Sequence, residues 1–380
     1  MKILHLVYEC VPGAFRGGVQ KMVLELACAQ QAMGNRVEIW TIGEEAGISD
    51  HEGVTLRYFS GRIRFSSAAM QRELREKRGQ FDIIHSHNTF LPLNRYAAEA
   101  ARKGSRVFFN PHGALDDRLL KGYSLRAIKK RIYNRLFERP NLNVAAGVIG
   151  LTAQECDQLR LFGVRVPIHE VSNGISMHDA PVSESEQKAF RRRIGTSMDA
   201  PILLFIGRIT GKKGLQFAIE ALAHLRDRHP TAVLAIAGDR KADPAYVAAL
   251  DQLVAKYALG DRVRWVGFLD EKAKPAALAT AAAFVHCSYS EGMAMAILEA
   301  MAIGTPCVVT PGCYMHKAAE AGALLEVEQS GTAIADGLDM LLKETEKAKQ
   351  IGQSGRAYIK AHHDWTAIAT TMIGIYEGKG

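Results

Sequence analysis

Residues 290–306 read SEGMAMAILEAMAIGTP, and Glu291 and Glu299 stand eight positions apart within them. The stretch between them predicts a turn that runs into a short helix, with Glu291 just before the helix and Glu299 about two turns inside it. The first turn of a helix offers backbone N–H groups that favour an anion, and each carboxylate can accept hydrogen bonds from hydroxyls. The pattern suits a phosphate with hydroxyls on both sides, which is the layout of a nucleotide sugar.

The same two glutamates have a purely structural interpretation, because acidic residues near a helix start also stabilise the macrodipole. Their surroundings favour a ligand. The apolar run 282–286 precedes Glu291 and the run 307–309 follows the helix, so both runs predict strands of a βαβ unit. Ligands of open α/β sheets bind at the carboxyl ends of the strands, which is where the glutamates stand.

Short apolar strands alternate with helical patterns along the whole chain of 380 residues. This alternation predicts the α/β class, with two Rossmann-like, doubly wound parallel-sheet domains that face one another across a cleft. The predicted strands are Ile3–Val7, Val37–Trp40, Asp82–His85, Val107–Asn110 and Gly147–Gly150 in the first half, and Ile202–Ile206, Val233–Ala237, Val263–Trp265, Ala282–His286 and Cys307–Val309 in the second.

A polar stretch after Asn173-Gly174 predicts a linker and hinge. The predicted domains are residues 1–172, on the acceptor side, and residues 173–364, which bind the nucleotide sugar. Asp364 predicts a helix N-cap, so the helix 365–380 is expected to kink away and cross back to the first domain.

The net charge of +8 lies in the first half of the chain. Residues 1–175 contain 25 Lys and Arg against 17 Asp and Glu, whereas residues 176–380 contain 23 of each. The first half is therefore expected to face a phospholipid surface or a phosphate-bearing substrate, and no nucleic acid is expected as a partner.

The chain has no run of 18 apolar residues and no pattern typical of a cleaved signal peptide, so a cytoplasmic protein is expected. Its six cysteines lack Cys-x-x-Cys spacing, which predicts reduced core thiols rather than disulfides or zinc ligands.

Two further strand ends carry groups that suit phosphate. After the first strand of the second half, Arg208 offers a bidentate guanidinium and Lys213 a point charge, whereas Lys212 is expected to be solvated. After the first strand of the chain, Gly17 and Gly18 let a phosphate or sugar approach the backbone closely, although such a pair is more often a simple turn.

Histidines follow two strands of the first half. His112 lies between Pro111 and Gly113, and we expect it to face the cleft and donate a hydrogen bond to a sugar hydroxyl or phosphate; a buried structural histidine is the alternative. His85 and His87 end another strand, and one of them is expected to line the acceptor side.

Residues 118–139 predict an amphipathic helix with eight basic side chains, in which Ile128, Ile132 and Leu136 recur every four residues. Such a helix can lie on an anionic membrane, and the alternative is a helix that faces the core with a solvated outer side. Asp116-Asp117 just before it lacks a third ligand for a metal, so a helix cap is the expected role.

With these motifs in order, the chain resembles the retaining glycosyltransferases of family 4, the glycosyl transferases of group 1, over nearly its whole length. The resemblance implies the GT-B fold of two Rossmann-like domains. The motifs that carry it are Gly17-Gly18-Val19-Gln20, Pro111-His112-Gly113, Ser172-Asn173-Gly174, Gly207-Arg208 with Lys213-Gly214, and Glu291–Glu299 followed by AMAIGTP.

The resemblance also implies roles for individual residues. Glu299 would bind the ribose hydroxyls and Glu291 the hydroxyls of the donor sugar, while Arg208 and Lys213 would neutralise the leaving diphosphate. His112 would contact the transferred sugar. The implied donor-binding residues are Gly17, Gly18, Arg208, Lys213, Glu291, Gly292, Met293, Ala294 and Glu299, and the implied catalytic residues are His112, Arg208, Lys213 and Glu291.

Two departures bear on the substrates. The family often has Phe-Gly after the first glutamate, whereas this chain has Met293-Ala294, which adds a Cβ where the backbone approaches the donor. The segments 311–315 and 112–116 resemble variants in bacterial surface-polysaccharide members, which favours a polyprenyl-diphosphate-linked saccharide as acceptor.

The resemblance therefore implies a retaining hexosyltransferase that uses a UDP- or GDP-sugar, needs no metal or cofactor, and acts in the cytoplasm, with a peripheral membrane position if the basic helix docks. Two other functions fit the same fold. A non-hydrolysing UDP-sugar epimerase would act without an acceptor, and a non-catalytic subunit would bind nucleotide sugar without turnover.

Overall fold

The computed structural model describes all residues except 14, 16–17, 62–65, 116–124, 178–180 and 380. The chain forms two compact units. Unit 1 comprises Met1–Gly174 and His363–Gly380, and unit 2 comprises Ile175–His362. The units therefore divide after Gly174 and after His362, against expected boundaries at residues 172 and 364.

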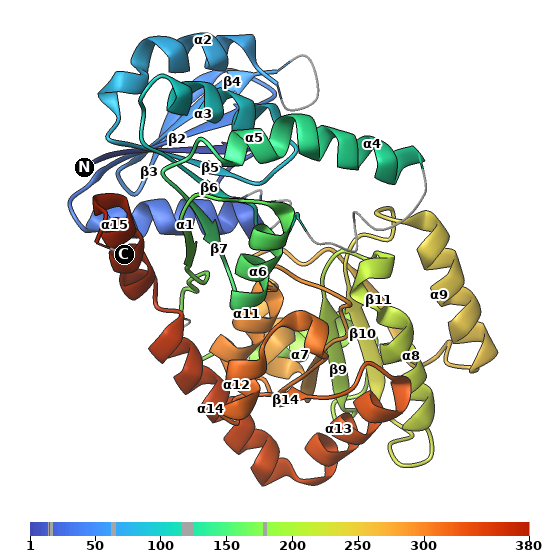
Figure 1. Ribbon diagram of the computed structural model, residues 1–380. Helices are drawn as coiled ribbons and strands as arrows, with labels where there is room; N and C mark the ends of the chain where they lie inside the picture. Colours follow the sequence, from blue (N-terminus) through green and yellow to red (C-terminus); the bar gives the residue numbers. More distant parts are fainter. Residues whose placement is uncertain (14, 16–17, 62–65, 116–124, 178–180, 380) are drawn as a thin grey trace. The chain divides into compact units, whose positions relative to one another are not determined.

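Unit 1 is built on an eight-stranded sheet in the order β3-β4-β2-β1-β5-β6-β7-β8, blue to green in Figure 1. All neighbouring strands are parallel except β3, which is antiparallel to β4. Central strands are buried on both faces, as parallel sheets require. The strands are β1 Lys2–Tyr8, β2 Arg36–Gly43, β3 Gly47–His51, β4 Val54–Ser60, β5 Ile83–His87, β6 Val107–Asn110, β7 Gly147–Gly150 and β8 Ile168–Glu170.

Helices cover both faces of this sheet. On one face, α1 and the last helix α15 pack together against residues such as Ile3 and Val7; on the other, α2, α3 and α6 pack against residues such as Leu4 and Leu6. The helical segments are α1 Gly18–Ala32, α2 Ala68–Lys77, η1 Arg78–Gln80, α3 Pro92–Arg102, α4 Leu125–Tyr133, the π-helix η3 Asn134–Glu138, α5 Arg139–Leu142, α6 Ala153–Phe162 and α15 Trp365–Glu377.

Unit 2 contains a six-stranded parallel sheet in the order β11-β10-β9-β12-β13-β14. The chain starts at β9, adds β10 and β11 on one side and then returns to place β12 on the other. The order of strands thus reverses between β9 and β12, which pair directly. The strands are β9 Ile202–Ile206, β10 Val233–Ala237, β11 Val263–Gly267, β12 Ala283–His286, β13 Cys307–Val309 and β14 Leu325–Glu326.

Two separate apolar layers enclose the sheet of unit 2. Side chains of α7, α10 and α11 form one layer, and side chains of α8, α9 and α13 form the other. The helical segments are α7 Glu184–Arg193, η4 Gly211–Lys213, α8 Leu215–His224, α9 Pro244–Lys256, α10 Lys274–Thr280, α11 Met295–Ile303, η5 Pro311–Cys313, α12 His316–Glu320, α13 Gly331–Lys343 and α14 Thr345–His362.

The predicted strands are all present, with ends shifted by at most three residues, so the predicted class of two doubly wound α/β sheets is confirmed. The prediction omits β3, β4, β8 and β14. These strands are short or form a hairpin, so they lack the flanking helices by which the other strands are identified.

The junction before the last helix is as predicted. Asp364 is the N-cap of α15, and its Oδ1 accepts a hydrogen bond of 3.0 Å from the backbone N–H of Ala367. Nearby, His363 Nδ1 lies 2.8 Å from the carbonyl oxygen of Asn173. A Cβ on Gly174 would overlap the ring of Trp365, so a glycine is needed at this approach.

All six cysteines are free. Five of them are buried, as predicted for core thiols, whereas Cys28 is partly buried. Among the described residues, no helix combines the length and the apolar character that crossing a bilayer would require.

Candidate active site

The predicted phosphate-binding residues of unit 2 follow the two strands at which the strand order reverses. Arg208 and Lys213 follow β9, and Glu291 follows β12. Such a reversal opens a crevice at the carboxyl ends of the strands, where α/β proteins bind ligands. The helix α11 begins at Met295, so Glu299 lies one turn inside it and not two, because residues 291–294 remain in the loop.

Glu291 is the most heavily engaged carboxylate of this site. Lys213 Nζ and Ser288 Oγ both donate hydrogen bonds to its Oε1, and His286 Nε2 lies 3.1 Å from the same oxygen. Burial alone would raise the pKa of Glu291, but Lys213 and His286 outweigh it and hold that pKa well below the usual range. Glu291 is therefore a fixed carboxylate at neutral pH.

Glu299 is held by a lysine that the sequence analysis did not identify. Lys274 Nζ lies 2.7 Å from Glu299 Oε1 and 2.6 Å from Glu271 Oε1. Glu299 and Lys274 are mostly buried, whereas Glu271 is exposed. Lys274 begins α10, so the start of this helix and the first turns of α11 meet at the predicted ribose end of the site.

The loop after β9 places its two cations differently. Arg208 is exposed, and no described residue forms an ion pair with it, so its guanidinium is available to an anion. Lys213 ends the 3₁₀ turn η4 and is already paired with Glu291. Gly214 follows with φ +63°, and a Cβ there would overlap the carbonyl oxygen of Cys287, so only glycine allows the two loops to approach.

The loop between Glu291 and α11 carries the predicted amide contacts. Gly292 and Ala294 are buried and Met293 is partly buried. Ala294 caps α11 with no side-chain hydrogen bond, so no side chain of the cap competes with a ligand for the N–H groups of the first turn. The extra Cβ of Ala294 is accommodated within the core of unit 2.

In unit 1, the corresponding strand edge is strained. Four non-glycine residues with positive φ follow its parallel strands: Glu9 after β1, Asn88 and Phe90 after β5, and His112 after β6. Such conformations cost free energy and cluster at functional sites. Gly18 is the exposed first residue of α1 at the same edge, whereas Gly17 lies outside the described residues, as do Asp116 and Asp117.

His112 is held in place from two sides. Its φ of +54° turns the chain after β6, and its Nε2 lies 3.1 Å from His87 Nδ1. The next residue, Gly113, donates its N–H to Glu155 Oε1 at 2.6 Å, and Glu155 Oε2 accepts from the N–H of Leu151 at 2.9 Å. Glu155 thus fixes the His112 loop. Glu155 was not among the residues identified from the sequence, although its position three residues after Thr152, the N-cap of α6, is typical of a capping pair.

His85 and His87 do not line an acceptor site. Both are fully buried beside His5 within unit 1, so the expectation that one of them lies on the acceptor side is wrong. The prediction assumed that the strand ends at His85, whereas β5 continues to His87 and keeps both side chains on a covered face.

The described part of the basic helix exposes its apolar stripe. Ile132 is 53% exposed, Leu136 is 60% exposed and Phe137 is 51% exposed, and Lys129 and Arg135 beside them are also exposed. The alternative in which this helix faces the core is therefore wrong for α4 and η3. Residues 118–124 lie outside the described part of the chain.

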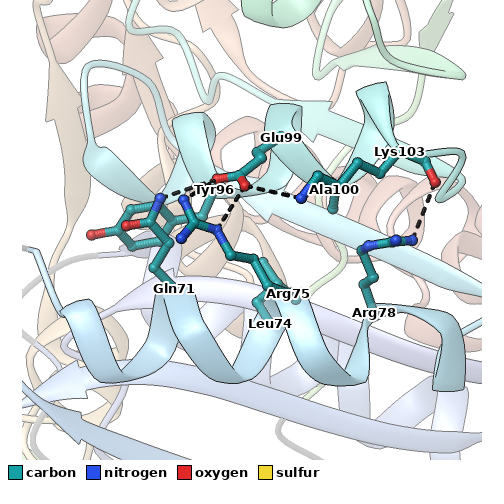
Figure 2. Close-up of a pocket in the computed structure, with 8 residues that line it drawn as sticks. All are labelled: Gln71, Leu74, Arg75, Arg78, Tyr96, Glu99, Ala100 and Lys103. Atoms are coloured by element: carbon teal, nitrogen blue, oxygen red, sulfur yellow. Dashed lines mark hydrogen bonds and ion pairs between the residues drawn. The ribbon is translucent and has the colours of Figure 1, made fainter.

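A small pocket between α2 and α3 has a different character (Figure 2). Arg75 donates to both carboxylate oxygens of Glu99, at 2.7 Å and 3.0 Å, and Gln71 donates to one of them at 3.1 Å. Arg75 thereby lowers the pKa of Glu99 to about 2. These polar groups satisfy one another's hydrogen bonds and so link the two helices. The pocket is therefore not a ligand site.

Comparison with known proteins identifies the family. The model of the glycosyl transferase 4-like domain matches residues 17–174, and the model of glycosyl transferases group 1 matches residues 186–358. The D-inositol 3-phosphate glycosyltransferase of Jonesia denitrificans is 25% identical over 393 residues, which cover 95% of this chain and 91% of that protein.

Two solved structures share the fold over the full chain. Sucrose-phosphate synthase from Thermosynechococcus elongatus superimposes with a TM-score of 0.80 and 22% identity, covering 99% of this chain and 98% of that one. HepE from Anabaena, solved in complex with UDP and glucose, has a TM-score of 0.80 and 19% identity, with 100% of both chains covered. The chain belongs to the group 1 glycosyltransferases and has their GT-B fold.

Proposed function

We propose that the protein is a retaining glycosyltransferase that moves a hexose-type sugar from a UDP- or GDP-sugar to a saccharide acceptor. The observation that carries this proposal is the cluster at the strand reversal of unit 2. No described residue forms an ion pair with Arg208, Lys213 pairs with the carboxylate of Glu291, and Glu299 lies one turn inside α11. The complex of the Anabaena neighbour with UDP and glucose supports a nucleotide sugar as donor.

The charges of this cluster suit departure of a nucleoside diphosphate. When the anomeric bond breaks, negative charge develops on the diphosphate, and fixed cations and helix-end N–H groups stabilise it. Arg208 supplies a free guanidinium for two phosphate oxygens, and the first turn of α11 supplies the N–H groups. In this proposal no metal is needed, because the protein itself carries the stabilising charge.

Glu291 binds the sugar and is not the nucleophile. Three donors already converge on its Oε1, and an anion stabilised in this way is a weak nucleophile. The carboxylate accepts hydrogen bonds from donor hydroxyls instead. A donor phosphate oxygen then helps to take the acceptor proton as the acceptor attacks from the front face, and the anomeric configuration is retained.

Product analysis tests this reaction class. With a nucleotide sugar and a saccharide acceptor, NMR of the anomeric proton is expected to show the configuration of the donor in the product, and dialysis against EDTA is expected to leave the rate within about twofold. An inverted product would contradict the proposed mechanism. Conversion of the donor to its epimer without acceptor would instead identify an epimerase, and donor binding without any turnover would identify a binding subunit.

The acceptor is proposed to be linked to a polyprenyl diphosphate, with synthesis of a bacterial surface polysaccharide as the role. Support comes from the segments 112–116 and 311–315 and from the exposed stripe of α4 and η3. A helix with exposed Ile132, Leu136 and Phe137 among basic side chains suits the surface of an anionic bilayer. Docking there would bring the first unit to a lipid-linked substrate from the cytoplasmic side.

Sedimentation with liposomes tests the docking. Binding is expected to need anionic lipid, to weaken strongly between about 0.1 M and 0.5 M salt, and to fall at least about tenfold in a Lys129→Gln, Arg131→Gln, Arg135→Gln variant, since each basic residue contributes about 1 kcal/mol near such a surface. The matched control removes three exposed lysines from α14, with Lys347→Gln, Lys349→Gln and Lys360→Gln. Equal loss in both variants would contradict docking through α4.

A further inference from the structure

Three of the histidines of unit 1 form one line that leads from the core to the strand edge. His5 lies in β1, His87 in β5 and His112 directly after β6, while His85 lies beside the line in β5. His5, His85 and His87 are fully buried. A buried glutamine, Gln30 of α1, closes the inner end of the line. An uncharged, fully polar row of this kind is unusual in the core of a parallel sheet.

The distances show a continuous hydrogen-bonded chain. His5 Nε2 lies 2.8 Å from Gln30 Oε1, His5 Nδ1 lies 2.9 Å from His87 Nε2, and His87 Nδ1 lies 3.1 Å from His112 Nε2. Successive rings are 5.2 Å and 5.3 Å apart between centroids, with interplanar angles of 25° and 26°. The imidazoles therefore meet end to end, with each plane tilted by about 25° from the next.

The three histidines of the chain are neutral. Burial lowers the pKa of His5 to about 4 and that of His112 to about 3, and it holds the pKa of His87 well below its ordinary value. A neutral imidazole has one N–H and one lone pair, so it can donate at one end and accept at the other. In a chain of such rings, the hydrogen bonds must therefore all be donated toward one end or all toward the other.

Gln30 selects the direction. Its Oε1 faces His5 and can only accept, so the proton of His5 is on Nε2 and its Nδ1 is an acceptor. His87 must then donate from Nε2 and accept at Nδ1, and His112 must donate from Nε2. The one nitrogen of the line left for a ligand is Nδ1 of His112, which no described residue bonds, and it carries a lone pair.

A metal site is the competing interpretation, because His5, His85 and His87 each offer a ring nitrogen within 4.8 Å of the others. The geometry opposes it. Bonds of about 2.0–2.1 Å to a tetrahedral zinc would set two ligand nitrogens roughly 3.3 Å apart, with both lone pairs aimed at the ion. His5 and His87 approach to 2.9 Å along a shared line, and that gap holds a proton.

We propose that Gln30, His5 and His87 are positioning residues, which hold His112 as the Nε2–H tautomer so that its Nδ1 accepts a hydrogen bond from a hydroxyl of the transferred sugar. The inference rests on the proposed function for the contact with sugar. It reverses the polarity expected from sequence, in which His112 donates to the sugar. It also gives a reason for the polar row in the core. The acceptor of Gln30 fixes the proton position on His5, which fixes it on His87 and then on His112.

The test measures tautomers directly, in protein without donor. In a long-range ¹H–¹⁵N correlation spectrum of histidine-labelled protein, with the His112 signal assigned by its loss in His112→Gln, the wild type is expected to show the Nε2–H pattern. Gln30→Met keeps the side-chain volume but removes the acceptor. It is expected to convert His112 to a mixture of tautomers and to raise the KM for donor about 2- to 10-fold, with little change in kcat.

Ser86→Ala is the matched control, because it removes one buried hydrogen bond of the same strand, the 2.9 Å contact with Asn94 Oδ1, on the face of β5 opposite to the chain. It is expected to change neither the tautomer nor the KM. An Nδ1–H form of His112 in the wild type, or an unchanged tautomer in folded Gln30→Met, would overturn the proposal. Stoichiometric binding of Zn²⁺ that His5→Phe abolishes would also overturn it. Correct tautomers in a protein that binds no nucleotide sugar would contradict the proposed function and not the tautomer assignment.

Discussion

Lys213→Met is expected to lower kcat about 10²- to 10³-fold and to destabilise unit 2 by roughly 3 kcal/mol. The loss of turnover follows from the proposed role of the ammonium beside the leaving diphosphate. The loss of stability follows from Glu291, which would remain as a carboxylate without its cation. The two side chains are only 12% and 10% exposed, so water cannot replace the lost partner. Steady-state kinetics and calorimetric unfolding measure the two effects.

A double variant separates the two effects. Lys213→Met with Glu291→Gln removes both charges and leaves an amide that His286 and Ser288 can still bond. It is expected to recover most of the stability, because a buried pair that is removed completely costs far less than a pair that is broken. It is not expected to recover kcat. Recovery of turnover together with stability would show that Lys213 acts only on folding.

The pH dependence gives a second signature of the pair. The pKa of Glu291 is lowered in the folded protein, so the stability that the pair contributes is present above the unfolded value of 4.5 and is lost as the pH falls through the folded value. The stability difference between the wild type and Lys213→Met is therefore expected to be full above pH 4.5 and to shrink in more acidic buffer. A constant difference would contradict the ion pair.

Glu299→Ala is expected to raise the Kd for the nucleoside diphosphate about 10- to 150-fold and to leave kcat at saturating donor nearly unchanged. Hydrogen bonds to a charged group contribute roughly 1.5–3 kcal/mol, and ribose hydroxyls would make them in the ground state and the transition state alike. Arg208→Ala is expected to do the opposite, with kcat lowered about 10²- to 10³-fold. Isothermal titration calorimetry and initial rates distinguish the two.

Glu271→Ala is the control for Glu299. Lys274 pairs with both glutamates, and Glu271 is 41% exposed and outside the predicted contacts with donor. If Glu299 contacts the nucleotide directly, Glu299→Ala weakens nucleotide binding and Glu271→Ala does not. Equal losses in the two variants would mean that Lys274 is the group that matters. Stability is expected to change little in either case, because Lys274 keeps one partner.

The fold was predictable because its strands carry a strong local signal. Runs such as Ile202–Ile206 are apolar throughout, as strands covered on both faces are, and each is followed by a helix. The hairpin of β3 and β4 lacks that rhythm. β3 is exposed along most of its length, so the sequence GISDH shows no apolar pattern at all. Edge strands take their structure from the neighbour they pair with.

The site was predictable where spacing along the chain reflects proximity in space. Glu291 and Glu299 belong to one loop and helix, so their relation is visible in sequence. Lys274 is 25 residues from Glu299 in sequence. Within Glu271-Lys272-Ala273-Lys274, the residue types do not distinguish Lys274 from its solvated neighbours. Only its position at the start of α10 does so. The pairing of Lys213 with Glu291 spans 78 residues and depends on β9 lying beside β12.

Burial of polar residues was the least predictable property. His85 and His87 alternate with Ser86 in a strand that, from composition, would reach solvent at its end. They are buried because His5 supplies a partner for His87 and Tyr376 supplies one for His85, and these come from β1 and α15. The pattern of polar residues along one strand does not show which hydrogen-bond partners another strand or helix will supply.

The return of α15 to unit 1 has a consequence for biosynthesis. Ile368, Met372 and Tyr376 complete the apolar layer over α1, although residues 33–364, most of the chain, lie between these two helices. A ribosome that has finished unit 2 has not yet delivered the residues that close the layer over α1. Unit 1 therefore cannot complete its core until α15 has been synthesised, and α1 keeps an uncovered apolar face until then.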